Sequence, residues 1–397
     1  MKNVGKTKDC YGCGVCAITC GKRIIEIVLN KEGFYEPHVI NEDLCTSCGL
    51  CTEVCAYLHE DLAQGNRKIT HSYAAWSKDI AVRRKCSSGG IGFELGRSLI
   101  GKGYKVCGVR YNADQVRAEH YIATTEQELI PSIGSKYIQS YTVEGFKSIN
   151  RKDKYLVTGT PCQIDSFRRY IRRFKIEDHF VLMDFFCHGV PSMLLWKKYV
   201  REVERETGKI TYVSWRNKFT GWHDSWAMAI DGEEKGEKIN WHDSYNLLIR
   251  EKKSFYNSRL SQGDLFYHFF LTNDCLGKPC YEKCKYKYDR SSADIRIGDL
   301  WGDTYKSNED GVSAVIAFTE KGDQAIRLAN CELVCYPFGI VAEGQMRKSP
   351  QRKRIREWVI KSFGSDLPLS FIRLLHKLIH LPRRILNKII KVLRWRK

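Results

Sequence analysis

Two stretches of the sequence decide its N-terminal fold, and both are built from closely spaced cysteines. The first is CYGCGVCAITC, residues 10–20, and the second is CTSCGLCTEVC, residues 45–55. Both follow the spacing C-x2-C-x2-C-x3-C. Three cysteines at steps of three can surround one iron–sulfur cubane while the fourth binds a second one, so the pattern predicts two 4Fe-4S clusters with exchanged ligands. The first cluster is assigned to Cys10, Cys13, Cys16 and Cys55, and the second to Cys45, Cys48, Cys51 and Cys20.

The segment between the two motifs has the pattern of a β-hairpin. The segments at residues 23–30 and 34–40 flank the turn Lys31-Glu32-Gly33. Motifs and hairpin together closely resemble the bacterial two-cluster ferredoxin module, although Gly21 and Ala56 stand where that module usually has proline. A pair of zinc knuckles is the alternative, but zinc requires neither the triple step nor the doubled motif.

Length and composition indicate a globular chain rich in thiols. Its 397 residues, 43% of them hydrophobic, suffice for two or three domains of about 150 residues. The polar N-terminus leads directly into the first motif, so we expect the 17 cysteines to be metal ligands or free thiols in a reducing cytoplasm. No run of about 18 uncharged apolar residues predicts a membrane-spanning helix.

The net charge of +19 is unevenly distributed. Residues 366–397 contribute +8, and the other 365 residues contribute +11. A diffuse basic excess suits an anionic cofactor, an acidic electron-transfer partner or a membrane surface as well as it suits nucleic acid. No nucleic-acid-binding motif accompanies this charge, so we do not expect nucleic acid as a partner.

The chain after the ferredoxin module begins with a polar stretch. Residues 63–80 lack a sustained period and are interpreted as a linker. The loop Cys86-Ser87-Ser88-Gly89-Gly90 then opens a helical pattern over residues 91–100. Such a loop can bind a phosphate through its backbone N–H groups, or it can serve as a plain N-cap.

Two further units place a cysteine just after a strand. Strands predicted at 155–158 and 180–186 lead to Cys162 and Cys187, at the strand ends where ligand sites gather in open α/β sheets. The alternative is that both are buried structural thiols. A later group, Cys275, Cys280 and Cys284, is close enough in sequence to complete a third four-cysteine cluster with them.

Six short segments occur in an order that resembles one family. They are Ser87-Ser88-Gly89-Gly90, Gly134-Ser135-Lys136-Tyr137, Gly159-Thr160-Pro161-Cys162, Phe186-Cys187-His188-Gly189, Trp215-Arg216-Asn217-Lys218 and Ala293-Asp294-Ile295-Arg296-Ile297-Gly298-Asp299. Together they resemble the beta-subunit family of coenzyme F420 hydrogenase/dehydrogenase, here with an N-terminal ferredoxin module. The resemblance covers residues 1 to about 345. It implies FAD and a further iron–sulfur cluster in the second domain, but no particular substrate.

The resemblance also implies roles for single residues. The inner cluster would be bound by Cys162, Cys187, Cys280 and Cys284. Cys275 is kept as a reserve ligand, because three residues separate Cys280 from Cys284 where two are expected. The residues expected along the flavin are Ser87, Ser88, Gly89, Gly90, Ser135, Lys136, Tyr137 and Thr160, with Lys136 near phosphate or isoalloxazine. His188 is a weak candidate for a proton donor, or else a capping group.

The C-terminal segment has an amphipathic and basic pattern. Apolar residues at 371, 374, 375, 378 and 379 share one helical face, and a similar set follows Pro382. With Lys and Arg opposite, residues 367–397 are typical of a helix lying in a membrane interface. Packing against a partner or against the chain itself is the alternative.

These patterns predict an α+β chain with four parts. They are a ferredoxin-like 2x4Fe-4S domain at 1–62, a linker at 63–80, an α/β flavin and iron–sulfur domain with a mixed sheet at 81–350, and a basic amphipathic tail at 351–397. The predicted function is an oxidoreductase that passes electrons between 4Fe-4S clusters and FAD, to or from a two-electron substrate or a deazaflavin such as coenzyme F420. The direction of flow stays open, because cluster potentials depend on their surroundings.

Two other classes of function compete with this one. The chain could be a non-catalytic electron carrier or adaptor for a membrane-associated enzyme, for example in polysaccharide biosynthesis, and it would then contain iron without flavin. A nucleic-acid-binding protein with structural clusters is the third class, and it would bind in a strongly salt-dependent way.

Overall fold

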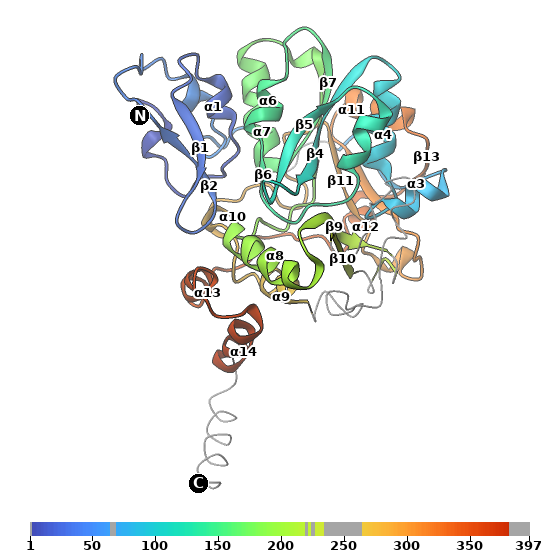
Figure 1. Ribbon diagram of the computed structural model, residues 1–397. Coiled ribbons are helices and arrows are strands. Elements are labelled where there is room, and N and C mark those ends of the chain that lie inside the picture. Colours follow the sequence, from blue (N-terminus) through green and yellow to red (C-terminus); the bar gives the residue numbers. More distant parts are fainter. Residues whose placement is uncertain (1, 64–68, 219–220, 224–226, 234–263, 381–397) are drawn as a thin grey trace, which may run out of the picture.

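The N-terminal domain folds around the predicted hairpin. The structure is a computed structural model that describes residues 2–63, 69–218, 221–223, 227–233 and 264–380. Strands β1 (Ile25–Leu29) and β2 (Tyr35–Val39) pair antiparallel, which confirms the hairpin. The other elements of the domain are η1 (Val4–Lys6), α1 (Val15–Thr19) and α2 (Leu50–Glu53). The domain lies beside helices α6 and α7 of the second domain (Figure 1).

A nine-stranded mixed sheet forms the centre of the second domain. Its order is β13-β3-β12-β11-β8-β7-β4-β5-β6. The four neighbours β11, β8, β7 and β4 are parallel to one another. The strands are β3 (His71–Ser77), β4 (Tyr104–Asn112), β5 (Arg117–Ala123), β6 (Ser140–Tyr141), β7 (Lys154–Thr158), β8 (Phe180–Phe185), β11 (Ile295–Asp299), β12 (Ser313–Ala317) and β13 (Cys331–Cys335). The mixed sheet agrees with the predicted fold class.

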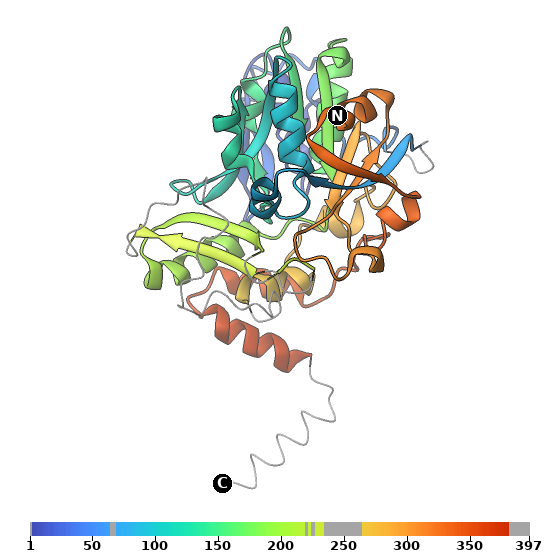
Figure 2. The ribbon, with the colours of Figure 1, turned by 90° about the vertical axis from the view of Figure 1, so that its right-hand side faces the viewer.

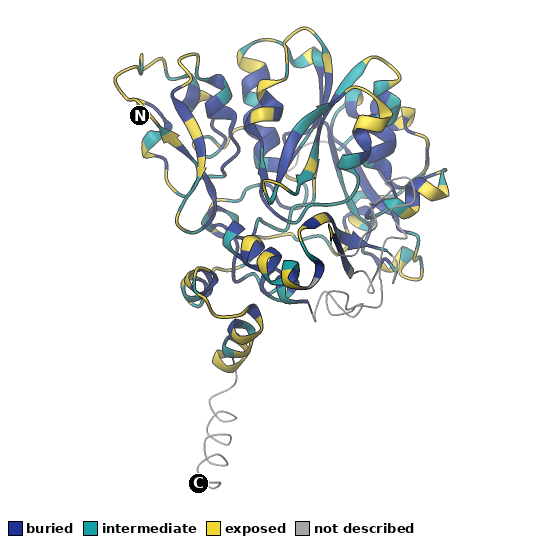
Figure 3. Cartoon of the chain, in the orientation of Figure 1, coloured by how far each residue is buried: buried dark blue, intermediate teal, exposed yellow. Residues whose placement is uncertain are grey.

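Helices cover both faces of this sheet. Helices α4 (Ile91–Ile100) and α11 (Glu320–Leu328) pack on one face, and α6 (Val143–Lys147) and α7 (Pro161–Arg173) pack on the other. In β8, Val181 belongs to the first core and Leu182 to the second. The central strands are therefore buried on both faces, as their dark colour in Figure 3 shows.

A third layer lies at one end of the sheet. The hairpin of β9 (Ile210–Asn217) and β10 (Ala227–Gly232) shares one apolar core with the helices there. These helices are α8 (Met193–Thr207), α9 (Leu265–Leu271), α10 (Lys278–Glu282), α13 (Arg356–Phe363) and α14 (Leu369–Ile379). Figure 2 shows α14 beneath the body of the molecule. Smaller elements are α3 (Ile80–Lys85), α5 (Glu126–Leu129), η2 (Ile130–Ser132), η3 (Glu177–His179), η6 (Asp303–Tyr305) and α12 (Phe338–Val341).

Two predicted boundaries are wrong. The predicted linker at 63–80 contains β3, which lies between β13 and β12 and has Ala74 and Ala75 fully buried. This strand was missed because burial on both faces removes the alternation by which strands are recognised. The tail predicted from residue 351 begins with α13, whose Val359 and Phe363 belong to the core. Residues 381–397 of the tail lie outside the described residues.

One face of α14 packs on the body and the other does not. Leu369 and Ile372 are buried in the core shared with α9, whereas Phe371 and Leu374 are 43% and 52% exposed. No helix within the described ranges is long and apolar enough to cross a lipid bilayer.

Candidate functional site

The structure gathers four cysteines of the N-terminal domain around one small pocket. They are Cys10, Cys13, Cys16 and Cys55, so the last cysteine of the second motif joins the first three of the first motif. Burial raises the pKa of the Cys55 thiol to about 12 and holds that of Cys16 well above its usual range. Such thiols need a bound metal to become thiolates.

The remaining four cysteines of this domain form a second group nearer the surface. Cys51 interacts electrostatically with Cys20, Cys45 and Cys48. Cys48 is exposed and Cys51 is buried. The side-chain amide of Asn3 donates to Cys45 Sγ at 3.5 Å and lowers the pKa of that thiol. We call these two sets the buried group and the outer group.

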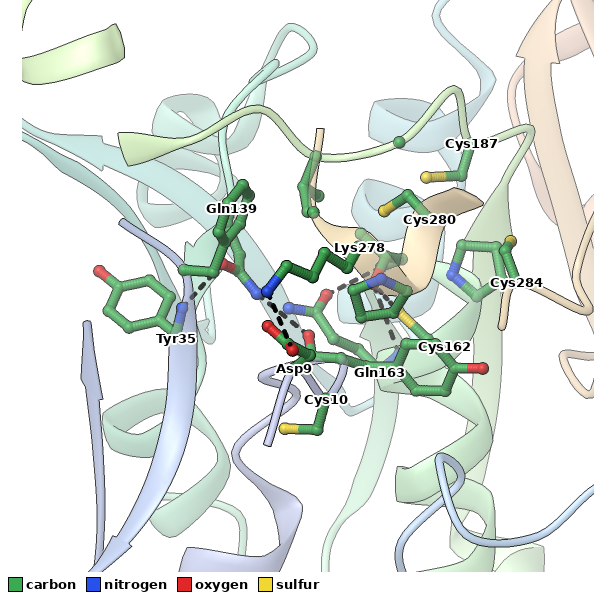
Figure 4. Close-up of a pocket in the computed structure, with 18 of the residues that line it drawn as sticks. Asp9, Cys10, Tyr35, Gln139, Cys162, Gln163, Cys187, Lys278, Cys280 and Cys284 are labelled. Carbon is green, nitrogen blue, oxygen red and sulfur yellow. Dashed lines mark hydrogen bonds and ion pairs between the residues drawn. The ribbon is translucent and has the colours of Figure 1, made fainter. Parts of the chain in front are cut away.

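Four cysteines of the second domain line a further pocket, which also includes Cys10 of the buried group. Cys162 begins α7, whose first turn is fixed by a capping box between Thr160 and Gln163. Cys187 lies two residues after the end of β8. Cys280 lies on α10, and Cys284 follows that helix. Figure 4 shows Cys162, Cys187, Cys280 and Cys284 gathered on one side of the pocket, with Cys10 across from them.

The reserve ligand Cys275 lies elsewhere. Its side chain is fully buried in the apolar core of the third layer, and its Sγ donates to the carbonyl of Phe269 at 3.3 Å. It does not line the thiol pocket. Spacing in sequence placed Cys275 near the other thiols, but the fold directs its side chain into the apolar core instead.

The four-thiol pocket has the chemistry of a 4Fe-4S site. Burial raises the pKa of Cys187 and, to about 12, that of Cys280. Beside them lies Lys287, which is 7% exposed and whose ammonium donates to the carbonyls of Cys187 and His188 at 2.6 and 3.0 Å. A buried cation next to four thiols favours a negatively charged occupant, as a thiolate-bound cluster is. The donor set therefore fits an iron–sulfur cluster.

A large cavity adjoins this pocket. It measures about 500 Å³ and opens at the carboxyl ends of β7, β8 and β11, which contribute Thr158, Phe185 and Asp299. Ligands of open α/β sheets bind at this edge, and the volume is within the range of cofactor sites. The residues that line both spaces are Thr160, Gln163, Cys187, Gly189, Val190, Tyr286 and Lys287.

Eight residues are predicted to lie along a flavin, and seven of them line the cavity. They are Ser87, Ser88, Gly90, Ser135, Lys136, Tyr137 and Thr160. The two loops are tied together, because the backbone N–H of Ser135 donates to Ser87 Oγ at 2.8 Å. Gly90 has a φ of +92° before the first turn of α4, which favours glycine. Gly89 is not among the lining residues. It packs against β3, where its carbonyl accepts the N–H of Ser77.

The cationic group of Lys136 is already engaged. Its Nζ donates to the four backbone carbonyls of residues 131–134, at distances between 2.8 and 3.2 Å. Lys218 repeats this arrangement with the carbonyls of Arg83, Ser88 and Asp310. Burial lowers the pKa of both lysines to about 7. Both side chains therefore hold the loops at the cavity in place.

Several residues of the cavity wall were not predicted. Asp299 accepts from the indole N–H of Trp222 at 2.8 Å and pairs with Arg216 at 3.3 Å. The guanidinium of Arg216 lies 4.6 Å from the ring centre of Trp301. Arg216 and Asp299 belong to two of the six family segments, but no role was predicted for either of them from the sequence. Lys287 could have been suspected from its place in the basic run after Cys284.

His188 lines the large cavity, and its neighbours Cys187 and Gly189 line both the cavity and the four-thiol pocket. Its ring contacts Phe270 with 4.7 Å between centres, and its buried Nε2 has no hydrogen-bond partner among the described residues. Burial lowers the pKa of His188 to about 4, so the imidazole is neutral near pH 7.

Two regions of the chain match known protein families. Residues 9–58 match the 4Fe-4S dicluster domain. Residues 152–335 match the family described as the C terminus of the coenzyme F420 hydrogenase/dehydrogenase beta subunit. The chain thus carries a region similar to this family, residues 152–335, behind a dicluster domain. These matches confirm the resemblance to an F420 hydrogenase/dehydrogenase-like subunit with an N-terminal 4Fe-4S dicluster domain.

The individual relatives of this F420 hydrogenase/dehydrogenase-like chain are distant. One is a subunit of the F(420)H(2) dehydrogenase of Methanosarcina mazei, which is 23% identical over 56% of this chain and 65% of its own length. The beta subunit of the coenzyme F420 hydrogenase of Methanococcus voltae is 31% identical over 31% of this chain and 46% of its own. The chain thus spans about half to two thirds of these relatives.

One solved structure is also similar to this chain. It is the F420-reducing [NiFe] hydrogenase complex from Methanosarcina barkeri, in a xenon-derivatized form. The matched chain is 17% identical with a TM-score of 0.45, and the match covers 75% of this chain and 89% of that one. The likeness is too distant to carry an argument.

Proposed function

We propose that the protein is an iron–sulfur flavoprotein that passes electrons between its ferredoxin-type clusters and FAD. The observation that carries the proposal is that the pocket of the buried group, the four-thiol pocket and the large cavity adjoin one another. Cys10 of the buried group lines the four-thiol pocket, and Cys187 lines both that pocket and the large cavity. When bound, the clusters carry single electrons and the flavin exchanges two.

The residues of the second domain divide between two cofactors in this proposal. Cys162, Cys187, Cys280 and Cys284 hold the third 4Fe-4S cluster, and the ammonium of Lys287 offsets its charge. FAD lies in the large cavity, with the 87–90 loop at its pyrophosphate. Lys136, Lys218 and the hydroxyl of Ser88 donate to backbone carbonyls, so phosphate recognition falls to backbone N–H groups at the start of α4 and to the hydroxyl of Ser87.

A two-electron partner reacts at the cavity. Coenzyme F420 is named for both curated relatives, and we propose it or another two-electron substrate for this chain. The neutral imidazole of His188 supplies a place for a proton at Nε2, in the wall of the large cavity. An electron-transfer protein or partner enzyme exchanges electrons at the N-terminal domain.

Metal and flavin analysis of anaerobically purified protein tests this proposal. We expect about twelve irons, matching sulfide and one FAD per chain, by counting four irons per cluster. Cys162→Ser should lower the iron content by about four. Cys275→Ser is the matched control, because it removes a buried thiol outside the pocket and should leave iron unchanged. About eight irons without flavin would favour the non-catalytic carrier or adaptor instead.

The exposed face of α14 supports a second proposal, that the protein attaches peripherally to a membrane from the cytoplasm. Phe371, Leu374 and Leu378 are exposed on one face, and the chain beyond residue 380 is strongly basic. Flotation with vesicles rich in anionic lipid should fall severalfold in a Phe371→Glu/Leu374→Glu variant. Glu substitutions at the exposed Leu328 and Ile80 provide the matched control. Equal flotation of both variants contradicts membrane attachment.

A further inference from the structure

Helix α7 connects two cluster sites within a single turn. Its first turn carries Cys162 of the four-thiol pocket. Ser166 follows four residues later on the same helix and is fully buried. Residues four apart lie on one helical face, so Ser166 projects beside Cys162 toward the N-terminal domain.

Ser166 contacts the N-terminal domain through two hydrogen-bonding groups. Its Oγ lies 3.2 Å from Cys13 Sγ, and the backbone N–H of Ala56 donates to the same oxygen at 3.0 Å. Cys13 belongs to the buried group, and Ala56 follows its fourth member, Cys55. One hydroxyl thus touches both chain segments that enclose this site.

The hydrogen bond from Ala56 fixes the direction of the one between Ser166 and Cys13. The oxygen of Ser166 accepts the Ala56 N–H, so the hydroxyl hydrogen remains available for donation. A cysteine bound to iron is a thiolate without hydrogen and can only accept. In the cluster-loaded protein, the hydroxyl therefore donates to Cys13 Sγ.

We propose that Ser166 is a positioning residue by which the second domain raises the reduction potential of the buried ferredoxin cluster. Reduction adds one electron to the cluster and forms no bond, and the added charge spreads onto the ligand sulfurs. A hydrogen bond to a sulfur is stronger in the reduced state, and such bonds are among the factors that set cluster potentials. The proposal rests on the proposed function only for the third cluster; the buried cluster belongs to the dicluster domain.

The position of Ser166 links this contact to electron transfer between the clusters. The serine lies one turn from a proposed ligand of the third cluster, so α7 fixes the spacing of the two clusters and also stabilises electrons on one of them. An isolated ferredoxin domain lacks this donor. Docking of the second domain therefore makes the buried cluster a better acceptor for electrons arriving from the outer cluster.

Potentiometric EPR titration of the full chain tests the proposal. Ser166→Ala should lower the midpoint potential of the buried cluster, by about 59 mV if the ratio of reduced to oxidised cluster changes tenfold. The potentials of the other clusters should not change. Signals are assigned with Cys48→Ser and Cys162→Ser variants. The deuterium coupling from the Ser166 hydroxyl, seen after assembly in D2O, should be lost in Ser166→Ala, whereas the coupling from the backbone N–H of Gly12 should remain.

Matched variants separate this effect from a loss of packing. Ser72→Ala removes another buried serine, whose hydroxyl donates to the carbonyl of Tyr336 far from the clusters, and should shift no potential. Ser166→Cys keeps a weak donor and should give a smaller shift in the same direction. This variant replaces Ser166→Ala in the test if the alanine variant binds too little iron.

Two results would overturn the proposal. One is an unchanged potential of the buried cluster in fully loaded Ser166→Ala, as expected if the hydroxyl donates to a carbonyl of α7 instead. The other is an equal shift of all clusters. A wild-type protein with eight irons and no flavin would refute the proposed function, but the shift in the buried cluster would still be measurable.

Discussion

The buried and outer groups of the N-terminal domain have the same spacing but different surroundings. The buried group lies against α7 of the second domain, and Ser166 contacts its Cys13. The outer group has Cys48 exposed and lies beside the exposed loop residue Leu44. Equal spacing thus fixes which thiols share a cluster, whereas the docking of the second domain decides which cluster faces inward and which faces a partner.

Removing one cysteine ligand from each group should reveal the largest difference between the two groups. We expect both Cys13→Ser and Cys48→Ser to lose about four irons per chain. Metal binding contributes to folding free energy, and the buried group also forms part of the domain contact. Cys13→Ser should therefore expose the N-terminal domain to proteolysis and rapid amide exchange, while Cys48→Ser should keep it protected. Similar protection of the two variants would contradict a structural difference between the groups.

Two arginines of α7 allow the domain contact to be weakened in steps. Arg169 pairs with the fully buried Asp165 and with Asp61 of the N-terminal domain, at 2.8 Å each. Its loss leaves the buried Asp165 with the hydroxyl of Tyr286 and the charge of Lys285 but without its direct ion pair, so Arg169→Ala should lower the free energy of unfolding by about 3 kcal/mol. One turn later, Arg173 pairs with Glu53 at the surface. Arg173→Ala is the matched control and should cost about 0–1 kcal/mol in denaturant unfolding.

The ion pair between Arg169 and Asp165 predicts that stability depends on pH. Burial raises the pKa of Asp165 above its usual value, with Arg169 acting in the opposite direction. An acid with a raised pKa binds more protons in the folded state, so its contribution to stability falls as the pH rises through that range. The loss of unfolding free energy caused by Arg169→Ala should therefore become smaller between about pH 8 and about pH 5.5. The loss caused by Arg173→Ala should change little. Parallel curves would contradict the assignment to Asp165.

The sequence predicts what depends on local spacing and misses what depends on distant contacts. The hairpin and the strands before Cys162 and Cys187 follow from patterns a few residues long. Strand β3 was missed because small residues buried on both faces show no alternation. Ser166 was missed because it meets Cys13 across 153 positions, and no local rule links such residues. Only folding brings such pairs together.

The smallest expected difference between the two groups is in their rates of chemical loss. Ferricyanide with a chelator should reach the outer group first, because its Cys48 is exposed in the folded protein, whereas the buried group requires the domains to open. A local opening free energy of about 1.4 kcal/mol already slows the reaction about tenfold. Iron release and EPR should show about four irons leaving in a first phase. In Arg169→Ala the second phase should accelerate and the first should not, since only the buried group is protected by that contact; a single phase in both proteins would mean that the groups are equally accessible.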